Sequence, residues 1–123
     1  MAKYVDGFVL VVSKKDIDAY EKMAKGAGKI WKKYGALDYK ECISEELQPD
    51  TQGMKQLGFE KLTKVKDDEV VFFSFIVYKS KKHRDSVNAK VMKDPFMKEC
   101  EGQEMPFKVS KFAWGGFEVL VDA

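Results

Sequence analysis

The pattern of apolar and polar residues marks four segments of the chain as β-strands. Residues 4–12 and 112–121, near the two ends, are rich in β-branched and aromatic side chains, which favour extended backbone. Residues 69–78 are almost continuously apolar, as in a strand that is covered on both faces. A weaker alternation over residues 37–44 predicts a fourth strand. We therefore expect one sheet that includes both end segments and has residues 69–78 at its centre.

Apolar residues at helical spacing separate the first two of these strands. From Ile17 to Tyr34 they recur every three or four residues, and most lysines lie on the opposite face, so an amphipathic helix is predicted. Ser13 and Asp16 have the spacing of a capping box at its start. Gly35 is placed to adopt the left-handed conformation that ends a helix.

A second helix is predicted after the central strand. Ser80 is placed to cap it, and Val87 and Val91 share one of its faces. Asp94-Pro95 ends this helix and can begin one more helical turn.

Two segments have patterns that fit neither a regular helix nor a regular strand. Residues 45–63 are polar at first and then carry scattered apolar side chains, so we expect a loop with a short helical piece that packs on the domain or covers a pocket. The pair Gly115-Gly116 interrupts the last strand and permits a bulge or a sharp bend.

The order of the predicted elements is strand, helix, strand, strand, helix, strand. This is the split βαβ arrangement of ferredoxin-like folds, an α+β class with helices on one face of an antiparallel sheet. The 123 residues suffice for one core, so residues 1–123 are predicted to form a single domain.

Composition narrows the choice of function. The formal net charge of +2 is too small to attract nucleic acid by overall charge. Cys42 and Cys100 lack CxxC spacing and His83 is the single histidine, so we expect reduced thiols and no metal site. No phosphate-binding loop or dinucleotide fingerprint is present, which predicts no cofactor. The chain shows neither a transmembrane run nor a secretory leader, so we expect a cytoplasmic protein that makes no membrane contact.

Period-two alternation separates the two faces of the sheet. Within residues 4–12, one face carries small side chains, and the other carries Asp6 among larger apolar residues. Within residues 69–78, Phe72 and Ser74 share one face of the strand. We expect this face to lie on the same side of the sheet as Asp6. We predict helices over the small face and a second subunit over the aromatic face, which makes the protein a homodimer. A dimer with a purely structural role is the simpler form of this hypothesis.

A pocket, either between the two sheets of the dimer or beside the helices, is the leading hypothesis for a functional site. Its predicted lining combines residues of the strands with polar residues of the second helix: Tyr4, Asp6, Tyr39, Phe72, Ser74, His83, Arg84, Asn88 and Trp114. Such a pocket would bind or transform a small, partly aromatic or anionic molecule, with Asp6 or His83 as the proton-transfer candidate. A packed, hydrogen-bonded His83 and an Arg84 paired with a carboxylate are the structural alternatives. The sequence leaves open whether the protein is an enzyme.

RNA binding is the alternative from another functional class. RNA-recognition modules share the same order of strands and helices and stack bases on aromatic sheet residues, a role that Phe8 and Phe72 could imitate beside the basic cluster of residues 79–84. The small net charge, the missing Lys/Arg-Gly-aromatic signature and a dimer that hides the aromatic face argue against it.

Four separated motifs resemble those of the YbaA-like family of small bacterial proteins of unknown function. They occur in the same order and are YVDGFV at the start, HRDSVNAKVMKDP in the middle, then MPF and GGFEVLVD. The resemblance implies a ferredoxin-like fold that pairs as a dimeric α/β barrel, and it implies no activity. Lys108 follows MPF where the family pattern has an aspartate, which puts in doubt any role of that acid here.

Overall fold

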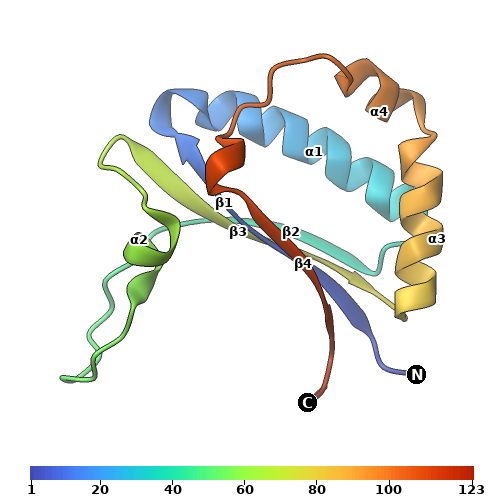
Figure 1. Cartoon of the computed structure of the whole chain (residues 1–123). Coiled ribbons are helices and arrows are strands. Elements are labelled where there is room, and N and C mark those ends of the chain that lie inside the picture. The colour runs from blue at the N-terminus through green and yellow to red at the C-terminus, as the bar shows by residue number, and fades with distance from the viewer.

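Four strands form one antiparallel sheet in the computed structural model, which describes residues 1–123. They are β1 (Tyr4–Ser13), β2 (Asp38–Ile43), β3 (Glu69–Tyr78) and β4 (Ala113–Glu118). The order across the sheet is β2-β3-β1-β4, and each neighbouring pair is antiparallel. The first and last strands therefore lie side by side (Figure 1), and the predicted central position of residues 69–78 is confirmed.

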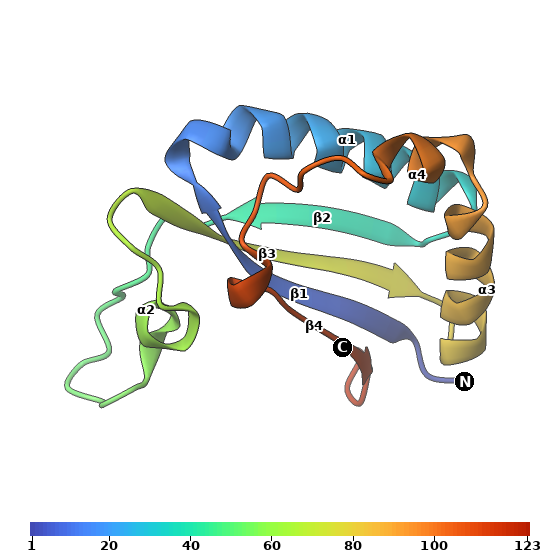
Figure 2. The same cartoon turned by 45° about the horizontal axis from the view of Figure 1, so that its top comes forward.

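Three helices cover one face of the sheet. Figures 1 and 2 show α1 (Ile17–Lys33), α3 (Lys81–Met92) and α4 (Pro95–Cys100) on this side, and α2 (Gly58–Thr63) on the other side near one end. Two short 3-10 turns complete the chain, η1 (Lys14–Asp16) and η2 (Val109–Lys111). None of the helices has the length and apolarity needed to cross a bilayer.

The predicted helix ends at Ser80 and Asp94 are confirmed as N-terminal caps, and Gly35 follows α1 with the expected positive φ of 112°. The Ser80 hydroxyl accepts a hydrogen bond from the His83 backbone N–H at 3.1 Å, and Asp94 accepts one from the Phe96 N–H at 2.9 Å. The capping box at Ser13 is wrong because the 3-10 turn η1 lies between Ser13 and α1, and the Ser13 side chain caps neither element.

The assignment of the two sheet faces is also wrong. Leu10 and Val12 of β1 and Phe72 of β3 pack in a cluster with Tyr20 and Ala24 of α1, so the face with the larger side chains lies beneath the helices. Alternation shows which side chains share a face, but it does not show which face the helices cover. The helices bury the face that removes more apolar area from water.

The opposite face of the sheet is partly open. Val11 and Val71 are buried at the end near α2, where Phe59 meets Phe73 edge to face with ring centroids 6.5 Å apart. The short helix expected within residues 45–63 is therefore confirmed, but it packs on the face opposite to α1, α3 and α4.

The bulge predicted at Gly115-Gly116 is wrong, because β4 pairs with β1 continuously through both glycines. Gly116 has another role in the packing. A Cβ atom at this position would lie 2.2 Å from the Tyr4 hydroxyl oxygen and 2.8 Å from its ring carbons. The missing side chain leaves room for the Tyr4 ring beside the strand.

Candidate functional site

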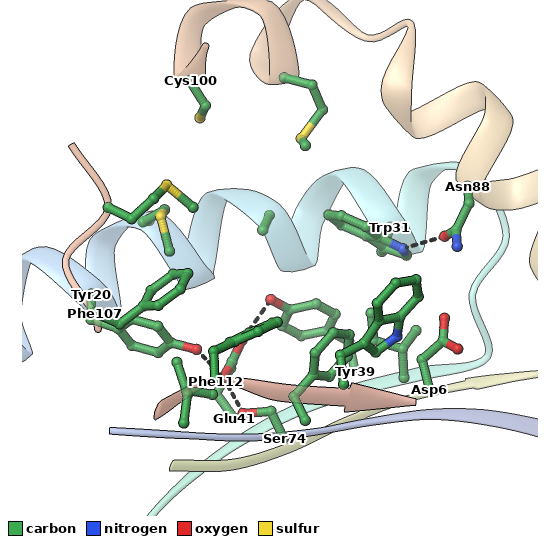
Figure 3. A pocket seen from close by; sticks show the side chains of 18 of the residues that line it. Asp6, Tyr20, Trp31, Tyr39, Glu41, Ser74, Asn88, Cys100, Phe107 and Phe112 are labelled. Carbon is green, nitrogen blue, oxygen red and sulfur yellow. Dashed lines mark hydrogen bonds between the residues drawn. The ribbon is translucent and has the colours of Figure 1, made fainter. Parts of the chain in front are cut away.

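A cavity of about 340 Å³ lies between the helix-covered face of the sheet and the helices α1, α3 and α4, and residues of the segment 101–112 contribute to it. Of its 21 lining residues, 16 are hydrophobic, so the few polar groups decide what it can bind. Four of these polar groups form two separate clusters. Figure 3 shows Asp6 and Asn88 at one end of the cavity, and Glu41 and Ser74 nearer its middle.

Asp6 is the most buried charged residue of the cavity, with 2% of its side chain exposed. The Arg84 guanidinium lies 3.4 Å from Asp6 Oδ1, but this oxygen accepts no hydrogen bond. Desolvation raises the pKa of Asp6, and the charge of Arg84 opposes this effect, as do the polar groups of Tyr78, Trp114 and Asn88 to a smaller extent. Asp6 therefore has an unused acceptor oxygen, a combination that suits a ligand contact or a proton acceptor.

Arg84 is held on the side of Asp6 that faces α3. Its guanidinium stacks over the Tyr4 ring at 4.9 Å from the centroid and lies 3.1 Å from Asp85. The guanidinium thus has two carboxylate neighbours and an aromatic neighbour, and it does not line the cavity. It is available to balance the charge of Asp6 more than to contact a ligand.

Asn88 joins α3 to the sheet and to α1. Its Oδ1 accepts hydrogen bonds from the Trp31 indole at 3.0 Å and from the Tyr78 hydroxyl at 3.3 Å. Burial raises the pKa of Tyr78, and the nearby negative charge of Asp6 adds to this effect. Tyr78 therefore stays a neutral hydroxyl that can donate a hydrogen bond.

Further along the cavity, three hydroxyl groups converge on Glu41. Tyr20 donates to Glu41 Oε1 and Tyr39 to Oε2, both at 2.8 Å, and Ser74 also donates to Oε1. Burial raises the pKa of both tyrosines, and the charge of Glu41 reinforces the shift. No lysine, arginine or histidine forms a salt bridge with Glu41 among the ion pairs of the structure.

Tyr20, Tyr39 and Glu41 also line a second hollow, of about 460 Å³, beside α1 and β2. The three hydrogen-bonded side chains therefore separate this outer hollow from the cavity. Gly28 leaves room for Tyr39 in this position, because a Cβ atom at Gly28 would lie 3.0 Å from the Tyr39 ring. The boundary formed by Tyr20, Tyr39 and Glu41 carries polar groups, whereas most of the cavity lining is apolar.

Five of the nine residues predicted for the pocket line the cavity, namely Asp6, Tyr39, Ser74, Asn88 and Trp114. Arg84 and Tyr4 lie behind Asp6 and outside the lining. Phe72 belongs to the buried cluster against α1. His83 also lies outside the cavity, where its Nδ1 accepts a hydrogen bond from the Lys79 backbone N–H at 3.0 Å.

Sequence reasoning missed Glu41, Tyr20 and Trp31. Glu41 lies two residues after Tyr39 on the same strand face, so strict alternation over residues 37–44 would have placed both in one site. Tyr20 and Trp31 are spaced like ordinary core residues of an amphipathic helix, and no sequence signal distinguishes them.

The aromatic residues proposed for base stacking are not available for it. Phe72 is 6% exposed, and Phe8 lies in the cavity under the helices. RNA-recognition modules need these rings on an open sheet face. That basis for an RNA-binding function is removed.

The chain is similar to proteins without an assigned activity. The family described as "Protein of unknown function (DUF1428)" matches residues 3–109. The uncharacterized protein YbaA of Escherichia coli K12 and that of Shigella flexneri are each 43% identical over 120 residues, which cover 98% of this chain and 98% of theirs. The chain also matches a crystal structure from Burkholderia cenocepacia, provisionally described as an amidohydrolase/peptidase, with 6% sequence identity and a TM-score of 0.32. The match covers 95% of this chain and 27% of the Burkholderia chain, and it is too weak to indicate a shared fold or function. The family match and the relatives together show that the chain belongs to the DUF1428 family of proteins of unknown function.

Proposed function

We propose that the chain forms a ferredoxin-like dimeric α/β barrel that binds a small, largely aromatic molecule in the cavity of each subunit, without a cofactor. The observation that carries this proposal is the unbonded Oδ1 of Asp6 in an otherwise apolar cavity. Native proteins rarely leave a buried polar atom without a partner. A ligand that donates a hydrogen bond to Asp6 would satisfy it.

The lining favours aromatic ligands. Phe8 stacks near Trp114 with centroids 6.3 Å apart, and Phe107 stacks near Phe112 at 5.3 Å. These rings all line the cavity. Aromatic side chains that flank an apolar space bind planar ligands well, because ring pairs gain more than their buried area alone provides.

Asp6 is also the proton-transfer candidate that the geometry favours if the ligand is transformed. Its raised pKa makes the carboxylate a better base than an exposed aspartate. His83 is less suited to this role because it does not line the cavity and its Nδ1 already accepts a backbone hydrogen bond.

Filling the cavity tests the ligand proposal. Replacing Ala27, which lines the cavity from α1, by leucine is expected to weaken the binding of one-ring and two-ring aromatic compounds by about tenfold, because the added atoms occupy ligand space. Ligand-observed NMR with the full chain measures the affinities. Ala89→Leu, which adds the same volume at an exposed site on α3, is the control. Failure of the unmodified chain to bind any such compound would contradict the proposal, as would unchanged binding by Ala27→Leu.

The open sheet face supports the dimer part of the proposal. Phe73 is 49% exposed and Phe117 is 62% exposed, and both lie on the face that α1, α3 and α4 leave free. Half-buried apolar residues surround them, including Val5, Val9 and Phe75. An apolar face of this kind suits a second copy of the chain, which supplies the same face through a twofold axis.

Light scattering after size-exclusion chromatography tests the dimer. The unmodified chain is expected to have twice its monomer mass at micromolar concentration, and the double variant Phe73→Asp/Phe117→Asp is expected to be monomeric, because the interface would bury two charges without partners. Ala89→Asp, at an exposed position of α3 on the other side of the sheet, should remain dimeric. A monomeric unmodified chain would contradict this part of the proposal.

A further inference from the structure

The two carboxylates of the cavity differ in whether a cationic side chain balances their charge. Arg84 lies beside Asp6, so the negative charge of Asp6 has a cation at 3.4 Å. Glu41 has three hydroxyl donors and no cationic side chain within salt-bridge distance. Lys40 lines the cavity, but its ammonium is paired with Asp38. The cavity therefore contains one carboxylate whose charge the protein does not balance.

The hydroxyl groups at Glu41 cannot donate to a ligand while they serve this carboxylate. Tyr20, Tyr39 and Ser74 each use their single O–H on Glu41 and leave only lone pairs for other contacts. This part of the cavity therefore accepts hydrogen bonds and donates none. It repels an anionic group and suits a group that is rich in donors.

The rings close to Glu41 add a second attraction for positive charge. Tyr20 lies 6.2 Å from Phe107, and Tyr39 lies 6.3 Å from Trp31, measured between ring centroids. A cation within about 6 Å of aromatic ring faces is stabilised by their quadrupoles, most strongly where water is excluded. Carboxylate and rings together favour an ammonium group.

We propose, on the basis of the cavity function above, that the ligand is an organic cation: an amine with one aromatic ring whose ammonium group contacts Glu41 and the Tyr20 and Tyr39 hydroxyls. Glu41 lies two strands from Asp6 and two residues further along the sheet, which separates their Cα atoms by about 12 Å. That span leaves room for one ring and a short chain. The unbonded Asp6 Oδ1 would accept a hydrogen bond from the other end of the ligand.

A cationic ligand differs from the partly aromatic or anionic ligand that the sequence predicts, which depends on Arg84 in the pocket. Arg84 instead balances Asp6 from outside the lining, and the cavity keeps an unbalanced negative charge.

Three matched probes test the sign of the ligand charge. Phenethylamine is a cation at neutral pH, phenethyl alcohol is its neutral analogue, and phenylacetate is an anion with the same ring. Isothermal titration calorimetry gives the affinities. Trp31 and Trp114, the two tryptophans of the chain, both line the cavity, so a change in tryptophan emission reports binding at this site.

We expect phenethylamine to bind at least about tenfold more tightly than the alcohol, and phenylacetate to bind most weakly, because a hydrogen bond between two charged groups contributes more than a neutral hydrogen bond. Glu41→Gln removes the charge and keeps one acceptor oxygen, while its NH2 donates to the remaining hydroxyl oxygen. It should reduce the amine affinity about tenfold while changing the alcohol affinity little. Glu46→Gln removes the same charge at an exposed loop position and should change neither affinity.

The possible results separate this inference from the cavity proposal. Equal affinity for the three probes, or an amine affinity unaffected by Glu41→Gln, would overturn the cationic ligand and leave the aromatic cavity ligand standing. Absence of binding by all three probes would overturn both. If Glu41→Gln does not fold, as judged by circular dichroism, the ranking of the three probes on the unmodified chain decides alone.

Discussion

Replacing Arg84 by methionine is expected to destabilise the fold by about 3 kcal/mol at neutral pH, because the buried Asp6 loses the cation that balances it. Asp6 and Arg84 have side-chain exposures of 2% and 14%, so water cannot replace the lost partner. Methionine keeps much of the apolar stem that packs on the Tyr4 ring. Urea denaturation measures the loss, and Lys81→Met, at an exposed pair with Asp85, is the control with the same charge change.

The effect of Arg84→Met should depend on pH in one direction. The pKa of Asp6 is already raised above its ordinary value by burial, so the native state binds a proton more readily than the unfolded chain does. The free energy of unfolding therefore falls as the pH rises from the pKa of Asp6 in the unfolded chain to its pKa in the folded protein. Without Arg84 the folded pKa rises further, so the penalty should be largest at neutral pH and should shrink as acid protonates Asp6.

A double variant isolates the charge on Asp6. Asp6→Asn/Arg84→Met removes both charges of this buried pair, so it should be more stable at neutral pH than Arg84→Met alone and should lack the added pH dependence. A single variant Arg84→Met that is as stable as the unmodified chain would show that Asp6 is not held by Arg84.

Glu69→Gln is expected to cost about 2 kcal/mol at neutral pH, because it removes a buried carboxylate that pairs with two lysines. The Glu69 side chain is fully buried, Lys111 lies 3.1 Å from Oε1, and Lys108 contacts Oε2. The hydrogen bond with Lys108 lowers the pKa of Glu69 from 4.5 to about 2. Exposure of Lys108 to solvent screens part of this interaction.

The lowered pKa of Glu69 also determines how its contribution to stability changes with pH. Glu69 contributes stability that is fully present above about pH 4.5 and is lost as the pH falls through about 2. Glu69→Gln should therefore show a weaker loss of stability between these two values, measured by thermal denaturation across a pH series. Glu99→Gln, on α4 and outside the salt bridges of the structure, is the control. An unchanged acid profile would mean that the two lysines do not stabilise ionised Glu69.

The Glu69 cluster also gives Lys108 a structural role. Lys108 pairs with Glu69 and does not line the cavity. An aspartate at this position would place two carboxylates together, which is unfavourable unless another cation approaches.

The sequence by itself determined the elements of this protein and part of its site. Local signals suffice for strands and helices, because alternation, helical spacing and side chains such as Ser80 and Asp94 act within a few residues. They also grouped Asp6 and Ser74 on one sheet face and named Tyr39 among the lining residues, and all three line the cavity. Side chains on one face of a sheet are already grouped by the period of two.

Only the tertiary structure decided which face the helices cover and which charges meet. Alternation is the same whichever face is buried, so it could not show that Phe72 packs on α1 and Phe73 faces outward. The pairing of Arg84 with Asp6 joins residues 78 positions apart in the sequence, and the convergence of Tyr20 on Glu41 depends on how α1 lies over β2. The chemistry of the cavity depends on such long-range contacts, because the charge left free is set by which partners the fold brings together.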